Sequence, residues 1–579
     1  MGFRVEKDVM VPMRDGAVLA TDLWIPDGGP SPALLVRLPY GKDVPNLLAY
    51  PLMPSIFALL EAGYAVAWQD CRGTFRSPGE FTPHKNDPHD GADTVAWLTK
   101  QSWCDGNIGS YGPSYLGFVQ WDTASQTPAG LKAIAPAVTT TDYYLTPWYS
   151  AGGAVSWHAM WSWTTLMTLT AAQNALLAGT GDPSALMEAA GMMADPQTHM
   201  SALPMNDQPL LNKQSPWWLE LAAHPSRDQF WQDLAVSQHP DRVTVPALNI
   251  GGWFDLFVDS TARTYTKMRA EAGSAEARDG QRLIIGPWDH LSHDGLYHDR
   301  QFGLAAGAMA NDLTGAHIRF FDRHLRGRTD ALDGTAPVRI FVMGVDQWRD
   351  EQDWPLPGTH YTDYYLGGAG HAATAEGDGT LSTERPAAEA TDTYDYDPAN
   401  PVPSLGGRVM MPAAVNAVGP ADQRPVEERG DVLCFTTPEL TGPVEVTGHV
   451  QLVLHVTSSA RDTDFTGKLV DVFPDGRAIY LTDGILRARY RNSLTEAELL
   501  EPGQTYELRL DLSVTSNVFL PGHRIRLEVS SSNFPRYDRN TNTGGTIAED
   551  TADQAVVATN TILHGPGHLS RLVLPAISR

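Results

Sequence analysis

The sequence predicts an α/β fold in which a doubly wound parallel sheet carries an inserted helical cap and precedes an all-β domain. Three observations indicate this class. Strand-like and helical segments alternate over residues 9–141, Ala- and Met-rich helical segments replace strands up to about 242, and short alternating runs separated by turn residues fill the chain beyond 350. The 579 residues are too many for one core. We expect these segments: 1–141 and 243–350 for the sheet domain, 142–242 for the cap and 351–579 for the β domain.

Apolar spacing supports each element of the first segment. Residues 33–37 (ALLVR) and 107–111 (NIGSY) have the character of buried strands. Residues 56–60 and 92–98 show the spacing of helices. Strands that alternate with helices in this way are typical of a parallel sheet covered on both faces.

The cap and the β domain differ in composition. The strongest helical stretches of the cap are 165–177 and 185–193. A Pro- and Gly-containing segment at 355–358 marks the domain edge, and the clearest runs of the β domain are 444–456, 468–472, 505–512 and 524–530.

A serine between glycines marks the turn after one predicted strand. Residues 112–117 read GPSYLG and directly follow the strand at 107–111. A sharp strand-to-helix turn of this kind lifts a serine hydroxyl out of the backbone, which is how α/β-hydrolases present their nucleophile. Leu116 stands where the common motif has its second glycine. Ser114 is the candidate nucleophile, although a glycine-rich loop that contains a serine by chance gives the same match.

Two later strands end in residues suited to activating Ser114. A serine hydroxyl needs a histidine base that a carboxylate orients, and α/β-hydrolases carry them in the order Ser, acid, His. The apolar run 245–250 leads into Asp255, and the run 282–285 leads into His290. We therefore expect Asp255 as the acid and His290 as the base.

Other residues compete for these roles. Asp259 lies a helical turn beyond Asp255 and fits a solvated helix face, and Asp289 is the direct neighbour of His290 and is poorly placed to face it. His290, His293 and His298 have a spacing that suggests a metal site, but no further ligand cluster completes it. We expect neither a metal nor a cofactor.

The oxyanion of the reaction needs hydrogen-bond donors. One donor is normally the backbone N–H after the nucleophile, which belongs to Tyr115 here. The loop after the strand at 33–37 contains Tyr40, whose hydroxyl is a suitable second donor. The residues alone fit a packed loop tyrosine equally well.

Several longer motifs accompany these residues, and they run from one end of the chain to the other. They are 11–16 (VPMRDG), 37–40 (RLPY), 69–75 (QDCRGTF), 252–255 (GWFD), 286–290 (GPWDH), 472–477 (VFPDGR) and 533–540 (NFPRYDRN). Together with the serine motif they resemble the bacterial cocaine esterase family, which groups with X-prolyl dipeptidyl peptidases and α-amino acid ester hydrolases. The resemblance implies an α/β-hydrolase domain with a C-terminal jelly roll.

The resemblance also implies roles for the candidate residues. Ser114 corresponds to the nucleophile, His290 to the base and Asp255 to the orienting acid. The Tyr40 hydroxyl and the Tyr115 amide correspond to the oxyanion hole. The resemblance therefore favours an oxyanion donor over a packed loop residue as the role of Tyr40.

An aromatic acyl pocket is implied as well, at Trp148, Trp163 and Phe257. Either tryptophan could instead be an ordinary core residue, since the chain contains 16 tryptophans. The sequence departs from the family pattern at Phe254, where a tyrosine is usual, and at residues 409–411. Both departures concern the identity of the substrate.

The charge and the cysteine content limit the binding partners and the cellular location that we expect. The formal net charge is −26, which disfavours binding to nucleic acid or to an anionic membrane. Three scattered cysteines and the lack of an apolar N-terminal stretch favour the cytoplasm. We expect a small ester as the binding partner, and a homodimer as a candidate assembly.

The leading hypothesis is a serine carboxylesterase that hydrolyses esters with an aromatic or bulky acyl group through an acyl-enzyme on Ser114. The second hypothesis is an X-Pro aminopeptidase, acylase or α-amino acid ester hydrolase with the same machinery. The third is a non-catalytic binding protein on a hydrolase scaffold.

Overall fold

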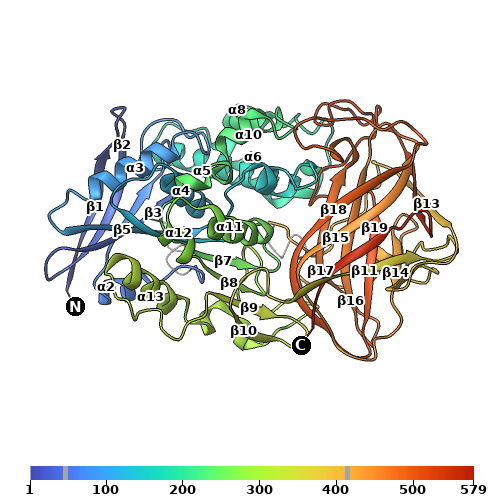
Figure 1. Ribbon diagram of the computed structural model, residues 1–579. Coiled ribbons are helices and arrows are strands. Elements are labelled where there is room, and N and C mark those ends of the chain that lie inside the picture. Colours follow the sequence, from blue (N-terminus) through green and yellow to red (C-terminus); the bar gives the residue numbers. More distant parts are fainter. Residues whose placement is uncertain (1, 44–49, 411–416, 579) are drawn as a thin grey trace.

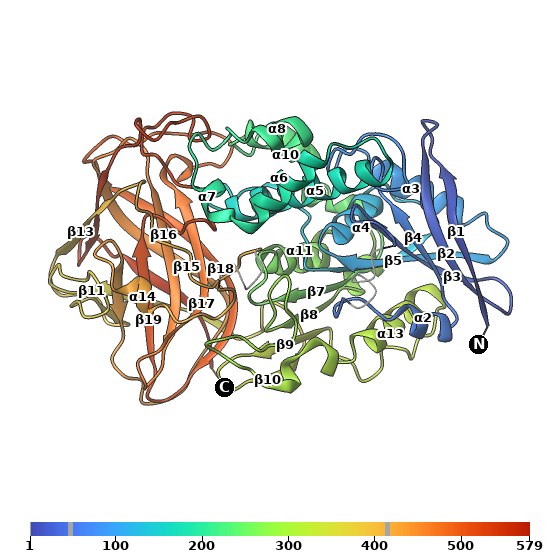
Figure 2. The same ribbon diagram turned by 180° about the vertical axis from the view of Figure 1, so that it is seen from behind.

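The computed structural model describes residues 2–43, 50–410 and 417–578. Figure 1 shows a sheet-and-helix part next to a part made of strands, with the helices of residues 157–234 lying along one side of both. The view from behind in Figure 2 has the same arrangement. The expected class, an α/β domain with a helical insertion and a strand-rich C-terminal domain, is confirmed.

The first sheet has ten strands in the order β1-β2-β4-β3-β5-β6-β7-β8-β9-β10. The strands from β4 to β9 are parallel, and β1, β2 and β10 are antiparallel edge strands. The strands are β1 (Phe3–Pro12), β2 (Val18–Pro26), β3 (Ser31–Leu38), β4 (Ala65–Asp70), β5 (Cys104–Pro113), β6 (Leu131–Ala137), β7 (Leu248–Gly252), β8 (Arg282–Gly286), β9 (Val338–Val342) and β10 (Gln347–Glu351).

Helices cover both faces of this sheet, which explains why its central strands are continuous apolar runs. One buried cluster packs α3, α4 and α11 against one face, and another packs α2 and α13 against the other. The helices of this part are α2 (Ile56–Glu61), α3 (Asp87–Leu98), α4 (Tyr115–Ser125), α11 (Val258–Glu271), α12 (Ala275–Asp279) and α13 (Leu313–Leu325).

The insertion between β6 and β7 is helical in the described chain. It contains a π-helical turn (Tyr144–Trp148), α5 (Trp157–Leu177), α6 (Pro183–Ala194), α7 (Pro196–Met200), α8 (Pro209–Gln214), α9 (Trp217–Ala222) and α10 (Gln229–Leu234). The predicted helices at 165–177 and 185–193 lie within α5 and α6. Helix α5 begins earlier than expected because burial of its Trp-rich first half outweighs modest helix propensity. No helix of the described residues has the length and apolar character needed to cross a bilayer.

The C-terminal domain is a second sheet of eleven strands. Its strand pairs are antiparallel except for the pairing of β12 with β14. All four runs singled out in the sequence overlap strands of this sheet, in agreement with a β-sandwich. The strands are β11 (Thr359–Gly367), β12 (Thr380–Ser382), β13 (Ala390–Tyr396), β14 (Leu433–Thr436), β15 (Val444–Ser458), β16 (Asp464–Val472), β17 (Ala478–Arg487), β18 (Tyr506–Phe519), β19 (Arg524–Ser530), β20 (Ala558–His564) and β21 (Arg571–Ile577).

The two domains share a hydrophobic core. A single buried cluster runs from the loop after β7, through Trp253 and Phe254, into the strands of the C-terminal sheet. The buried Arg408 reinforces this contact: its Nε donates to the Trp253 carbonyl at 3.1 Å and its Nη2 donates to the Val514 carbonyl at 2.7 Å. The C-terminal domain therefore fixes the loop that carries Asp255.

Candidate active site

Ser114 lies at the turn between β5 and α4, at the carboxyl edge of the sheet. Its backbone has φ 57° and ψ −123°, a conformation that is strained for a residue with a side chain and that turns the hydroxyl outward. Gly112 has φ 139°, and a Cβ there would lie 2.7 Å from the Leu116 side chain. The turn therefore needs glycine at 112, while Leu116 fills the core beside it.

The structure brings the three predicted catalytic residues together. The Nε2 atom of His290 is 3.1 Å from the Ser114 Oγ, and its Nδ1 is 2.6 Å from the Asp255 Oδ2. The other carboxylate oxygen of Asp255 accepts the Phe257 N–H at 2.7 Å. Asp255 is 0 % exposed, so the surrounding protein excludes water from its contact with the imidazole.

The rival acids point elsewhere. Asp259 lies in α11, where it pairs with Arg263 at 2.7 Å, and it is 3.4 Å from the His449 Nδ1 of the C-terminal domain. Asp289 accepts the backbone N–H groups of Leu291 and Ser292 at 2.7 and 2.8 Å. Burial raises the pKa of Asp289. The side chain of Asp289 is thus engaged in shaping the histidine loop.

The other histidines of this loop have separate environments. His293 is buried 3.2 Å from the Tyr50 hydroxyl, and burial lowers its pKa to about 3. His298 is fully exposed beside Asp299. Among the described residues, three potential metal ligands gather at Asp259, His449 and Asp511, and Arg263 already forms ion pairs with both carboxylates.

Tyr40 and Tyr115 flank the nucleophile. The Tyr40 hydroxyl accepts a hydrogen bond from the Trp163 Nε1–H at 2.9 Å. Burial raises the pKa of Tyr40 to about 12, and its contacts with Trp163 and Ser114 offset part of this rise. The phenol is therefore a neutral hydrogen-bond donor at physiological pH. Tyr115 is the first residue of α4, where a backbone N–H has no acceptor within the helix.

An aromatic cavity adjoins Ser114. It has a volume of about 20 Å³, close to the room that one water molecule needs. All three residues of the implied acyl pocket border it. The lining residues are Tyr40, Ser114, Tyr115, Phe118, Pro147, Trp148, Ala159, Trp163, Phe257 and Met410.

The two departures from the family pattern lie in different places. Phe254 is buried among Tyr297, Phe302 and Tyr480, in the core shared with the C-terminal domain, and does not border the cavity. Met410 does border it, while residue 411 lies outside the described residues.

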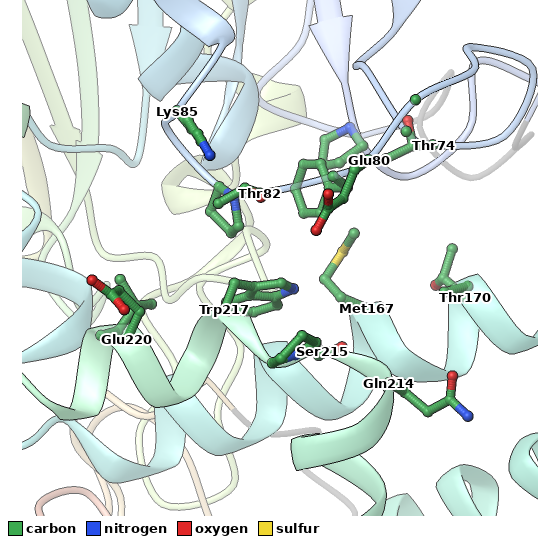
Figure 3. A pocket seen from close by; sticks show the side chains of 18 of the residues that line it. Thr74, Glu80, Thr82, Lys85, Met167, Thr170, Gln214, Ser215, Trp217 and Glu220 are labelled. Carbon is green, nitrogen blue, oxygen red and sulfur yellow. The ribbon is translucent and has the colours of Figure 1, made fainter.

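A much larger cavity, of about 860 Å³, lies between the cap and the loop of residues 73–85. Figure 3 shows Trp217 and Met167 projecting from the cap helices, opposite Glu80 and Thr82 of the loop. Trp217 packs edge-on against Trp163 with 5.2 Å between ring centroids, so this pair separates the large cavity from the small one.

Sequence reasoning missed several residues of the site. The Tyr50 hydroxyl donates to the His290 carbonyl at 2.8 Å across 240 positions of sequence, and no local motif marks it. Phe118 lies one helical turn beyond Ser114, so the predicted helix after the nucleophile is the only signal that points to it.

Two family models match the chain. The X-Pro dipeptidyl-peptidase (S15 family) model matches residues 15–292, and the X-Pro dipeptidyl-peptidase C-terminal non-catalytic domain model matches residues 330–573. The cocaine esterase of Rhodococcus sp. (strain MB1 Bresler) is 49% identical over 580 residues, which cover 100% of this chain and 99% of that protein.

Solved structures agree with this relationship. An aminopeptidase from a marine sediment archaeon, Thaumarchaeota archaeon, superimposes with a TM-score of 0.82 at 27% identity, covering 100% of this chain and 97% of that one. An α-amino acid ester hydrolase gives a TM-score of 0.78 at 26% identity, with 99% and 96% covered. The predicted resemblance is confirmed: the chain belongs to the X-Pro dipeptidyl-peptidase (S15) family of α/β-hydrolases, in its cocaine esterase branch.

Proposed function

We propose that this chain is a serine carboxylesterase that hydrolyses esters with an aromatic or bulky acyl group. One observation carries the proposal: His290 lies between the Ser114 hydroxyl, at 3.1 Å, and the buried Asp255 carboxylate, at 2.6 Å, beside an aromatic cavity. The 49% identity to a cocaine esterase supports a hydrolase that acts on ester bonds.

The reaction begins with proton transfer from the Ser114 hydroxyl to the Nε2 of His290 as the oxygen attacks the ester carbonyl. Asp255 accepts the Nδ1–H of His290, so the imidazole keeps the tautomer in which Nε2 is free to take the proton. The tetrahedral intermediate collapses when His290 protonates the leaving alcohol. Water then attacks the acyl-enzyme with the same base and releases the acid.

The negative oxygen of the intermediate requires two donors. The Tyr40 hydroxyl supplies one, because its raised pKa keeps it protonated, and the Tyr115 backbone N–H at the start of α4 supplies the other. The acyl group lies among Trp148, Trp163 and Phe257. Since the cavity is small, the bordering side chains, Met410 in particular, move when a bulky acyl group enters.

A second candidate uses the same catalytic residues, either on amide bonds, as an X-Pro aminopeptidase or acylase, or on α-amino acid esters, as an α-amino acid ester hydrolase. The aminopeptidase similar to this chain over its whole length favours this candidate. A matched pair of substrates, 4-nitrophenyl benzoate and N-(4-nitrophenyl)benzamide, separates the two activities, because both carry the benzoyl group and differ only in the bond that is cleaved. The esterase proposal predicts that the ester is cleaved and that cleavage of the amide is not detectable, whereas an amide-cleaving enzyme would hydrolyse both.

Ser114→Ala tests the proposal directly. We expect kcat/KM for 4-nitrophenyl benzoate to fall by about 10⁴-fold or more, since the nucleophile is lost while binding remains. Labelling by a fluorophosphonate probe should disappear as well. Ser125→Ala, at the far end of the helix that follows Ser114, is the control and should keep the labelling. Full activity in Ser114→Ala would contradict the mechanism.

The other expectations remain part of the proposal. The three cysteines are free and buried, which supports a cytoplasmic location, and cell fractionation tests this location.

We also propose a homodimer, the four-segment division given above and jelly-roll connectivity for the C-terminal domain. Light scattering of the purified protein tests the assembly.

A further inference from the structure

Trp163 contacts the side chains of Tyr40 and Tyr115, the two residues that supply the proposed oxyanion donors. Its indole Nε1–H donates to the Tyr40 hydroxyl at 2.9 Å. Its ring stacks on the Tyr115 ring, with 5.6 Å between centroids and 10° between planes. The side chain is 6% exposed, so both contacts are sheltered from water. A residue that only lined an acyl pocket would need neither of them.

The hydrogen bond from Trp163 determines where the Tyr40 proton points. An indole N–H can only donate, so the Tyr40 oxygen must accept it with a lone pair. The single proton of the phenol is then directed away from Trp163, and Tyr40 borders the same cavity as Ser114. Accepting a hydrogen bond also polarises the O–H group and makes it a stronger donor. Tyr40 is thus preset to donate toward the reacting carbonyl oxygen.

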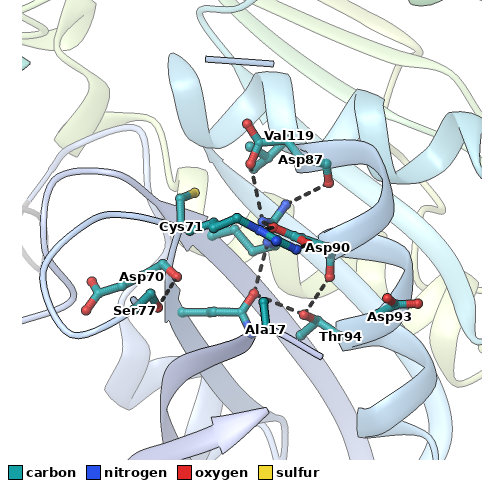
Figure 4. Close-up of polar contacts among 12 residues, drawn as sticks. Ala17, Asp70, Cys71, Ser77, Asp87, Asp90, Asp93, Thr94 and Val119 are labelled. Carbon is teal, nitrogen blue, oxygen red and sulfur yellow. Dashed lines mark hydrogen bonds and ion pairs between the residues drawn. The ribbon is translucent and has the colours of Figure 1, made fainter. Parts of the chain in front are cut away.

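The Tyr115 ring that supports Trp163 is itself held by a buried polar cluster. Its hydroxyl donates to the Asp87 Oδ2 at 2.6 Å, and the buried Arg37 guanidinium is 3.2 Å from the Asp87 Oδ1. Figure 4 shows Asp87 and Asp90 at the start of α3 within this cluster. Because its hydroxyl is bound by Asp87, the Tyr115 side chain is held in one position, and its ring orients the Trp163 ring that stacks on it.

From these contacts we infer that Trp163 is a positioning residue of the oxyanion hole, which orients the Tyr40 hydroxyl through its indole N–H. This role is separate from its contact with the acyl group, and the inference rests on the proposed function. It predicts that losing the N–H slows the chemical step, whereas losing aromatic surface weakens substrate binding.

Trp148 provides a matched comparison within the same cavity. It borders the cavity and packs edge-on against Trp163 at 5.4 Å. Its Nε1 is buried and has no hydrogen-bond partner among the described residues. Tryptophan-to-phenylalanine changes at the two positions remove similar aromatic surface, but only the change at 163 removes a hydrogen bond to Tyr40.

A double-mutant cycle with Tyr40→Phe tests the inference. We expect Trp163→Phe to lower kcat for 4-nitrophenyl benzoate by about 10- to 100-fold with KM changed less than about threefold, because one hydrogen bond to an oxyanion donor is lost. In the Tyr40→Phe background the same change should have almost no further effect on kcat. Trp148→Phe should alter KM and show no coupling to Tyr40→Phe.

The inference is overturned if Trp163→Phe lowers kcat equally with and without the Tyr40 hydroxyl, or changes KM alone. Activity that persists in Ser114→Ala would instead refute the proposed function, so the two failures are distinguishable. Indole ¹⁵N–¹H spectra of Tyr40→Phe provide a test that needs no change at 163. One indole N–H resonance should move upfield as its hydrogen bond is lost, and spectra in which none moves would also overturn the inference.

Discussion

His84 is a buried histidine with no hydrogen-bond partner for either ring nitrogen among the described residues. Its ring stacks on Tyr143 at 3.7 Å and lies 5.6 Å from the ring of Tyr115. Burial lowers its pKa to about 3, from an ordinary value near 6.5. The folded protein therefore holds the ring neutral beside the Tyr115 ring, whereas the same histidine in the unfolded chain would bind a proton in mild acid.

This environment predicts acid sensitivity. At a pH between the two values, His84 binds a proton in the unfolded chain but not in the folded one. The folded protein therefore keeps its full unfolding free energy above about pH 6.5 and loses part of it as the pH falls. At pH 5 the loss from His84 is ~2 kcal/mol. In His84→Phe, the drop in unfolding free energy between pH 7.5 and 5 should shrink by about this amount in urea titrations. The exposed His298→Phe is the control, and an equal drop in both variants would contradict the prediction.

At the scale of elements, α5 and α9 build the wall between the two cavities. Trp163 and Met167 come from α5, and Trp217 comes from the first turn of α9. Trp217 lies behind Trp163 and Trp148, with 5.2 and 6.5 Å between ring centroids, and borders the cavity of about 860 Å³. The position of α9 therefore limits the depth of the acyl pocket.

Trp217→Ala should join the two cavities. We expect the ratio of kcat/KM for 4-nitrophenyl octanoate to that for the acetate to rise about tenfold, since added methylenes gain apolar contacts. Trp218→Ala removes a neighbouring tryptophan that packs against Trp157 and does not border the large cavity, so it controls for lost stability. A ratio that stays unchanged in Trp217→Ala would show that the wall does not limit chain length.

At the scale of the whole molecule, a buried ion-pair cluster joins the cap to the C-terminal domain. Arg487 of β17 contacts Asp464 at 3.0 Å and Asp538 at 2.8 Å. Asp538 also accepts the Val155 N–H at 2.8 Å, just before α5 begins. The helix that carries Trp163 is thus anchored at its start by charges of the β domain.

Arg487→Met should therefore destabilise the protein by about 3–5 kcal/mol, because two buried carboxylates lose their cation. Differential scanning calorimetry measures the effect as a lower melting temperature. Arg509→Met, which removes an exposed pair with Glu507, should change stability by less than about 0.5 kcal/mol. Equal melting temperatures for the two variants would contradict the anchoring role.

Local patterns were sufficient to predict the elements of the fold and the order of the reacting residues. The strand ends before Ser114, Asp255 and His290 are visible as apolar runs followed by turn residues, because a parallel sheet buries its strands on both faces. The early start of α5 was missed, since burial of its tryptophans, and not propensity, extends the helix.

Contacts between distant segments needed the tertiary structure. The bond between Trp163 and Tyr40 joins positions 123 residues apart, and the bond from Tyr50 to His290 spans 240. The sequence by itself determined the fold class, the family and the identity of the candidate catalytic residues, because these depend on short motifs and hydrophobic periodicity. Only the tertiary structure decided the hydrogen-bond partners, the cavity volumes and the junction between cap and β domain, because packing between elements that are remote in the chain sets them.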